Sequence, residues 1–76
     1  MEKIKKIISE TFQIKESSIT SQTNMQDIDS WDSLTHMELI VSLEDEFSIE
    51  FTADEIMAMT DVEKIEKVVG EKVNGN

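Results

Sequence analysis

Apolar residues near the start of the chain follow a helical period. Ile4, Ile7, Ile8 and Phe12 recur at i, i+3, i+4 and i+8, which places them on one face of a helix over about residues 2–12. Residues 13–32, rich in Ser, Thr, Asn and Gln, show no such period. An ordered loop of this length is uncommon in a compact domain and is usually functional. Four apolar residues are spaced to pin this loop to the core: Ile14, Ile19, Met25 and Ile28.

Residues 33–47 also follow a helical pattern, with Asp32 as a suitable N-cap residue, but they carry apolar side chains on two faces. One broad face suffices for packing into a bundle: His36, Leu39, Ile40, Leu43 and Phe47. The second stripe lies roughly opposite, between Glu38 and Asp45 on one side and Glu44 on the other: Leu34, Met37 and Val41. This stripe either packs under the long loop or docks partner proteins that have an apolar pocket and a basic rim.

Two helix-start signals follow. Thr52 and Glu55 have the spacing of a capping box and predict a short third helix, and Thr60 and Glu63 give the same signal for a fourth helix. The apolar face of this last helix is Val62, Ile65, Val68, Val69 and Val73. We therefore predict an all-α fold, a four-helix bundle with a long first loop and a short third helix. Residues 1–76 form a single domain, with residues 74–76 as a frayed tail.

Charge and composition narrow the function. The net charge is −10, and no cation lies between Lys15 and Lys64, although acids recur throughout that segment. Such a field repels nucleic acid and anionic membranes and attracts basic protein surfaces, unless the charge only keeps the protein soluble. The chain has no Cys, no signal-peptide run and no apolar stretch of about 18 residues, so we expect a cytoplasmic protein without a membrane span.

A longer motif begins at the second helix. The run Asp32-Ser33-Leu34 is followed in register by Glu38-Leu39 and by Leu43-Glu44-Asp45-Glu46-Phe47. Over nearly its whole length the chain resembles the acyl carrier proteins and related phosphopantetheine-binding carrier domains. The resemblance implies a free-standing, non-catalytic carrier whose Ser33 receives 4′-phosphopantetheine from coenzyme A. It also implies a set of residues that partner enzymes recognise: Asp32, Leu34, Met37, Glu38, Val41, Glu44 and Asp45.

The chemistry expected at Ser33 is consistent with this resemblance. A serine in the first turn of a helix faces unpaired backbone N–H groups and the positive end of the helix dipole, which suit a phosphodiester. Because the chain has no thiol, the arm must bring one and present the acyl group as a thioester. The expected partners of this monomer are a phosphopantetheinyl transferase and acyl-loading and acyl-transferring enzymes with basic docking surfaces. The plainer interpretation is an ordinary helix-start serine.

Some positions depart from the pattern of fatty-acid carriers. Trp31 stands where many of them have a small residue, although it also suits a hydrophobic anchor, and Thr52 stands where proline is frequent. Bulky Phe51 and Ile56 reduce a candidate acyl pocket, whose residues are Leu43, Phe51, Ile56, Met59 and Ile65. We expect a specialised carrier for a short or polar acyl group, in a polyketide, nonribosomal-peptide, cell-envelope or sugar-modifying pathway. The alternative is the housekeeping carrier of fatty-acid synthesis.

Three other interpretations use the same segment. Asp27, Asp29 and Glu38 match positions 1, 3 and 12 of an EF-hand loop, but Trp31 and Asp32 at positions 5 and 6 argue against a dedicated calcium site. Weak divalent-cation binding by the acids stays open, as does an unmodified acidic interaction module. An enzyme could pair Ser33 with His36 and Asp32, but a nucleophile and its base need a specific mutual geometry, and we expect His36 to be structural.

Overall fold

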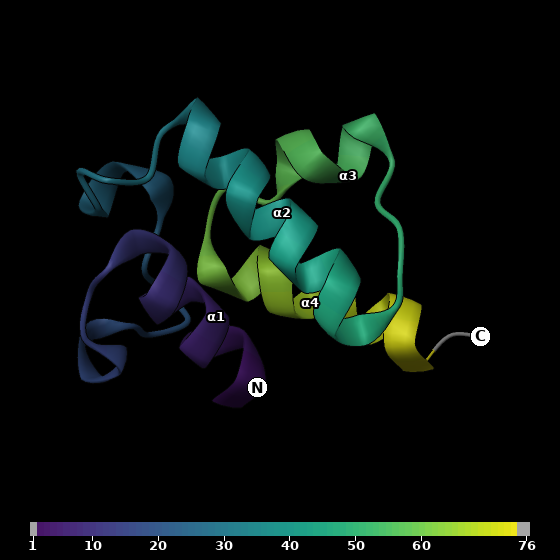
Figure 1. Ribbon diagram of the computed structural model, residues 1–76, viewed down its shortest axis with the longest axis horizontal. Coiled ribbons are helices and arrows are strands. Elements are labelled where there is room, and N and C mark those ends of the chain that lie inside the picture. The colour runs from purple at the N-terminus through teal and green to yellow at the C-terminus, as the bar shows by residue number, and fades with distance from the viewer. Residues whose placement is uncertain (1, 75–76) are drawn as a thin grey trace.

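The computed structural model describes residues 2–74 and confirms the predicted all-α bundle (Figure 1). Helices α1, α2 and α4 are long, and α3 is a single short helix. Their bounds are α1 (Glu2–Phe12), α2 (Ser33–Phe47), α3 (Ala53–Ala58) and α4 (Val62–Asn74). Asn74 is still helical, and the rest of the predicted frayed tail lies outside the described residues. Among the described helices, none has the length and apolar character needed to cross a membrane.

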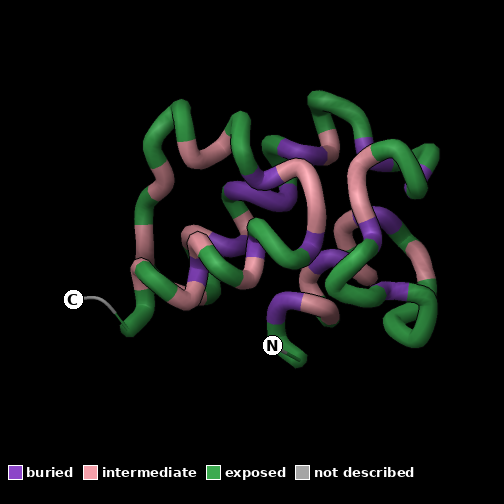
Figure 2. Tube along the Cα trace, turned by 180° about the vertical axis from the view of Figure 1, so that it is seen from behind, coloured by how far each residue is buried: buried purple, intermediate pink, exposed green. Residues whose placement is uncertain are grey.

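The core forms where the three long helices meet. In Figure 1, α2 crosses the middle of the molecule in front of α4, with α1 on one side and α3 on the other. The buried segments line the interior between the helices (Figure 2). The long helices contribute Ile4, Ile8 and Phe12 from α1, Leu39, Ile40 and Leu43 from α2, and Val62, Ile65 and Val69 from α4. Val73 lies on the same side as Val69, since both line a pocket with Ile4 and Phe47, but it is 47% exposed near the end of α4.

The long loop is ordered and anchored as predicted. Ile19 and Ile28 are buried, and Ile14 and Met25 pack against the core. The loop also contains two short 3₁₀ turns that its sequence pattern does not reveal, η1 (Glu16–Ser18) and η2 (Met25–Asp27). Turns of this kind are too short to give a helical period in the sequence.

Backbone hydrogen bonds fasten the long loop to the turn between α3 and α4. The N–H of Met25 donates to the carbonyl of Thr60 (2.9 Å), and the N–H of Val62 donates to the carbonyl of Thr23 (2.9 Å). An isolated antiparallel bridge joins Asn24 to Asp61 between them. The loop therefore lies at one end of the bundle, beside the start of α4.

Side-chain caps set the starts of α3 and α4. The predicted capping box of α3 is confirmed, with Thr52 N–H donating to Glu55 Oε1 (2.8 Å) and Glu55 N–H donating to Thr52 Oγ1 (3.2 Å). The predicted box at the start of α4 was wrong. Asp61 Oδ1 accepts the hydrogen bond from Lys64 N–H (2.8 Å), so Asp61 acts as the cap. The reason is the pairing with the long loop. The Thr60 carbonyl accepts the hydrogen bond from Met25 N–H instead of one from within the helix, and α4 begins at Val62, one residue later than predicted.

Candidate functional site

Ser33 is the first residue of α2 and is exposed to solvent. The preceding Asp32 caps the helix as predicted, because its Oδ1 accepts hydrogen bonds from the N–H groups of Leu34 and Thr35, each at 3.0 Å. In return, Asp32 N–H donates to Thr35 Oγ1 (2.9 Å), which completes a reciprocal capping box. The turn that carries Ser33 is therefore held by its neighbours while the Ser33 side chain stays accessible.

The cap changes one expectation about the start of α2. Two of the first-turn N–H groups that we expected to face a phosphodiester already bind the Asp32 carboxylate. The backbone N–H of Thr35, followed by the Thr35 hydroxyl and the Leu34 N–H, lowers the pKa of the Asp32 carboxyl below its ordinary value. Asp32 is thus an anionic cap beside Ser33, and a phosphate on Ser33 must lie outside this cap.

The second apolar stripe of α2 faces solvent. Leu34 is 70% exposed, Val41 is 53% exposed and Met37 is 46% exposed. The long loop does not cover these residues, because it is fastened to the turn before α4. We call Leu34, Met37 and Val41 the α2 stripe. Of the two interpretations left open by the sequence, the structure favours a surface that is free for docking.

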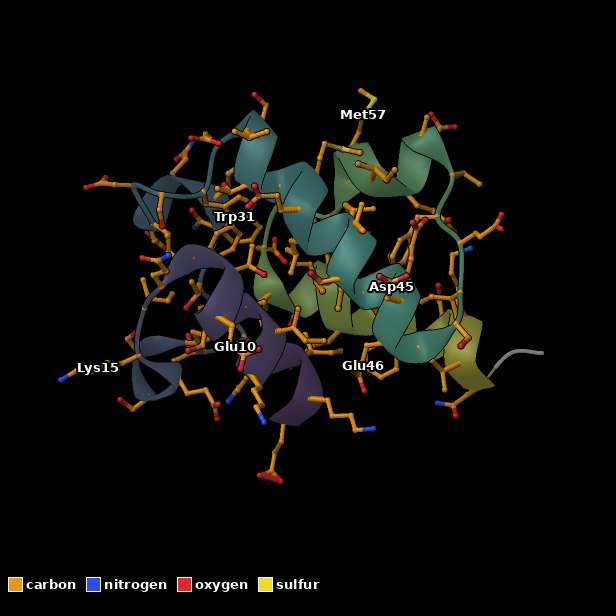
Figure 3. All side chains as sticks on the ribbon, viewed as in Figure 1. Glu10, Lys15, Trp31, Asp45, Glu46 and Met57 are labelled. Carbon is orange, nitrogen blue, oxygen red and sulfur yellow. The ribbon has the colours of Figure 1, made fainter. Side chains whose placement is uncertain are left out.

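Acidic residues border the α2 stripe. The predicted rim residues Glu38 and Asp45 are exposed. With Glu46 and with Glu10 of α1, they line a groove of about 630 Å³ between α1 and α2. Figure 3 shows Glu10, Asp45 and Glu46 on this side of the molecule. Sequence reasoning missed Glu10 because nothing in the pattern of α1 reveals which of its polar residues lies beside α2.

Glu44 has a different environment from the other predicted recognition residues. Its carboxylate Oε2 accepts a hydrogen bond from Phe51 N–H (3.0 Å), and its backbone carbonyl accepts from Ile49 N–H (3.2 Å). The side chain therefore fastens the connection between α2 and α3 to the end of α2. A structural role of this kind has no signal in the helical period, which places Glu44 beside the exposed stripe.

A further exposed apolar residue was missed by sequence reasoning. Met57, the last residue but one of α3, is 75% exposed and points away from the bundle (Figure 3). Because α3 has only six residues, its pattern does not show which of its apolar side chains faces outward. Met57 adds a second exposed methionine to the surface formed by α2 and α3.

The predicted acyl-pocket residues all belong to the core or pack against it. Leu43, Met59 and Ile65 are fully buried, and Phe51 and Ile56 pack half-buried against the same core. That these residues together enclose an acyl chain stays a prediction.

His36 does not form a catalytic pair with Ser33. The indole Nε1–H of Trp31 donates to His36 Nδ1 (3.0 Å), and His36 Nε2 forms a hydrogen bond of 2.9 Å with the carbonyl of Ile56. Both ring nitrogens are thus engaged within the fold, and neither is left to act as a base toward Ser33. The structural role expected for His36, and the anchor role of Trp31, agree with the burial of both side chains.

The acids of the EF-hand spacing do not gather around a common point. The Asp27 carboxylate accepts a hydrogen bond from Asn24 N–H (3.1 Å) and closes a capping box at η2. Within residues 2–74, no three His, Asp or Glu side chains are arranged to hold a metal ion. Asp27, the first acid of the EF-hand spacing, therefore stabilises a local turn.

Comparison with known proteins places this geometry in a family. The family model described as the phosphopantetheine attachment site matches residues 2–69. The chain is 44% identical over 73 residues to an acyl carrier protein of Lactobacillus acidophilus, covering 95% of this chain and 81% of the relative. The chain belongs to the acyl carrier protein family. A second acyl carrier protein, from Buchnera aphidicola, is 37% identical over 67 residues, which is 88% of this chain and 86% of the relative.

A solved structure agrees with this assignment. The solution NMR structure of a holo acyl carrier protein from Geobacter metallireducens has a TM-score of 0.85 and 35% sequence identity, covering 95% of this carrier and 83% of that chain. The family identifies phosphopantetheine as the prosthetic group of the carrier, and acyl groups as what it carries. Carriers of this family are acted on by a transferase and by partner enzymes rather than being catalysts themselves.

Proposed function

We propose that Ser33 is the attachment residue for the 4′-phosphopantetheine arm. The observation that carries the proposal is the exposed hydroxyl of Ser33 in the first turn of α2, directly beside the exposed α2 stripe. The neighbouring residues are compatible with an attached phosphopantetheine. The Asp32 carboxylate binds the N–H groups of Leu34 and Thr35 and so does not occupy the Ser33 hydroxyl. The arm supplies a thiol for thioester formation, which this chain, without cysteine, does not have.

The α2 stripe and its acidic rim are the surface by which enzymes recognise the carrier. The stripe offers apolar area that a partner pocket can bury, and Glu38 and Asp45 beside it favour a partner with a basic rim. The net charge of −10 steers such a partner toward the carrier from a distance. This arrangement suits a protein that binds several enzymes briefly and in turn.

Mass spectrometry tests the attachment. The apo-protein is incubated with coenzyme A and a broad-specificity phosphopantetheinyl transferase, and Ser33→Ala is treated in parallel. We expect the wild type to gain one phosphopantetheine and Ser33→Ala to gain none. The proposal is wrong if several transferases leave the wild type unchanged, or if Ser33→Ala still gains mass.

We further propose that the carrier serves a specialised pathway and holds a short or polar acyl group in solvent. Three polar links hold α3 and the segment before it over the candidate pocket. His36 binds the Ile56 carbonyl (2.9 Å), Glu44 binds Phe51 N–H (3.0 Å), and Lys72 Nζ lies 2.9 Å from Glu55 Oε1. An acyl chain that moved α3 aside to enter the core would have to break these hydrogen bonds and this ion pair. The cost of breaking them favours an acyl group that stays in solvent. Housekeeping fatty-acid synthesis is the competing assignment.

Thioester reactivity separates the two assignments. A transferase loads the carrier from coenzyme A thioesters with a short polar acyl group or with a long apolar one, and hydroxylamine cleavage of each thioester is followed by mass. Cargo that stays in solvent is cleaved at the same rate whatever its length. A long-chain thioester that is cleaved several-fold more slowly than the short one supports sequestration and the fatty-acid assignment.

A further inference from the structure

We infer that Trp31 and His36 are positioning residues for the modification of Ser33. The inference rests on the proposed attachment at Ser33 and concerns how the fold presents that hydroxyl. Trp31 lies two positions before Ser33, and His36 lies three positions after it. Both side chains are buried, whereas Ser33 between them is exposed. The exposed turn at Ser33 therefore lies between two buried side chains, Trp31 before it and His36 after it.

The first anchor fixes the end of the long loop. The Trp31 ring is 3% exposed and stacks on Phe12 of α1, with ring centroids 4.9 Å apart and an interplanar angle of 27°. Its backbone N–H donates to the Ile28 carbonyl (3.0 Å), and the hydroxyl of the preceding Ser30 donates to the Phe12 carbonyl (3.0 Å). The segment that leads into Ser33 is therefore fastened to α1 by both ring packing and hydrogen bonds.

The second anchor connects this segment to α2 and α3. Trp31 Nε1–H donates to His36 Nδ1 at 3.0 Å, which fixes the imidazole proton on Nε2. Nε2–H then donates to the Ile56 carbonyl at 2.9 Å. The imidazole of His36, with both nitrogens hydrogen-bonded, thus connects the loop end and the first turn of α2 to Ile56 within α3. Ser33 lies between the two anchors, in the exposed stretch of residues 32–34.

The reaction at Ser33 is sensitive to such anchoring. Ser33 Oγ attacks the β-phosphorus of coenzyme A; the new Oγ–P bond forms as the bond from phosphorus to the bridging oxygen breaks and adenosine bisphosphate leaves. The hydroxyl proton passes to a base of the transferase. Because attack needs Oγ in line with the leaving group, a misplacement of about 1 Å can cost about a hundredfold in rate. The anchors therefore act on turnover, while the α2 stripe acts on binding.

Variants of the two anchors separate positioning from docking. Trp31→Phe keeps an aromatic ring against Phe12 but removes the N–H that binds His36. We expect kcat for modification by a phosphopantetheinyl transferase with coenzyme A to fall by about tenfold or more, with KM for the carrier unchanged. His36→Asn keeps an acceptor near the position of Nδ1, whereas His36→Leu removes it. We therefore expect His36→Asn to retain most of kcat and His36→Leu to lose it.

A matched control removes the effect of stability alone. Val69→Ala truncates a buried residue of α4, in the core rather than in the anchor network, and is compared at a temperature at which circular dichroism shows every variant folded. A fall in kcat for Val69→Ala equal to that of Trp31→Phe overturns the inference, as does an unchanged kcat in Trp31→Phe. If the wild type itself is not modified, or is modified elsewhere than at Ser33, the proposed attachment is what fails.

Discussion

Two leucines of α2 test whether its two apolar faces have separate roles. Leu34 is 70% exposed in the α2 stripe, and Leu39 is 0% exposed in the core. Truncating each to alanine makes the same chemical change five positions apart on one helix. The proposal predicts that Leu34→Ala weakens recognition by a transferase with little effect on stability, and that Leu39→Ala lowers the unfolding free energy of the bundle.

The exposed fractions set the expected magnitudes. Full burial of a leucine side chain is worth about 1.5–3 kcal/mol, so docking that buries the exposed part of Leu34 gains about 1–2 kcal/mol. Its loss raises KM by about 5- to 30-fold, while the unfolding free energy changes by about 0.5 kcal/mol or less. Leu39→Ala is expected to cost about 2–5 kcal/mol of an unfolding free energy of about 4–11 kcal/mol.

The assay measures both quantities on the same samples. KM for the carrier is obtained from modification rates at increasing carrier concentration, and the unfolding free energy from urea denaturation followed by circular dichroism. An unchanged KM in Leu34→Ala, together with a loss of stability as large as that of Leu39→Ala, would refute the assignment of the α2 stripe to docking.

Three more predictions follow from charged residues. Glu38→Lys should raise the KM of the transferase for the carrier and weaken the dependence of this KM on salt. Glu71→Lys makes the same charge change on α4 and should change neither. Equal effects of the two variants would show that only the net charge matters and not the position of the acidic rim. The folded state lowers the pKa of the Asp32 carboxyl below its ordinary value of 3.8. The ionised cap therefore contributes its full stabilisation at a pH above 3.8, and this stabilisation is lost as the pH falls through the lower pKa of the folded state. Asp32→Asn, which keeps an acceptor that does not titrate, should therefore lose less in melting temperature on acidification than wild type does; an identical pH slope would contradict this. Lys72→Gln removes the ion pair with Glu55 and should speed amide hydrogen exchange in α3 but not in α1; unchanged exchange would show that α3 does not depend on this link.

The helical segments could be predicted because each carries its own local signal. The period of Ile4, Ile8 and Phe12 locates α1, and the N-cap residue Asp32 and the capping box at Thr52 locate the starts of α2 and α3. These signals depend on residues a few positions apart, so the sequence alone contains them.

Features that depend on distant parts of the chain could not be predicted. The exposure of the α2 stripe follows from where the long loop lies, and that is set by backbone bonds such as the one from Met25 to Thr60. The hydrogen bond between Trp31 and His36 is of the same kind, because the identities of the residues do not give the geometry of their rings. Glu44 was assigned to solvent for the same reason, since its partner Phe51 lies beyond the end of the helix.

The bonds between the long loop and the turn before α4 have a consequence for how the chain folds. They join residues from the first half of the sequence to residues near its last helix, so they form only after the intervening chain has closed on itself. Helices form locally within about a microsecond, whereas contacts between distant segments form only after the chain has lost the conformational entropy needed to close the loop between them. Order in the loop therefore depends on the packing of segments from both halves of the chain. Trp31, at the end of that loop, stacks on Phe12 of α1, so the ordered turn at Ser33 depends on the same tertiary packing and should be lost when the domain unfolds.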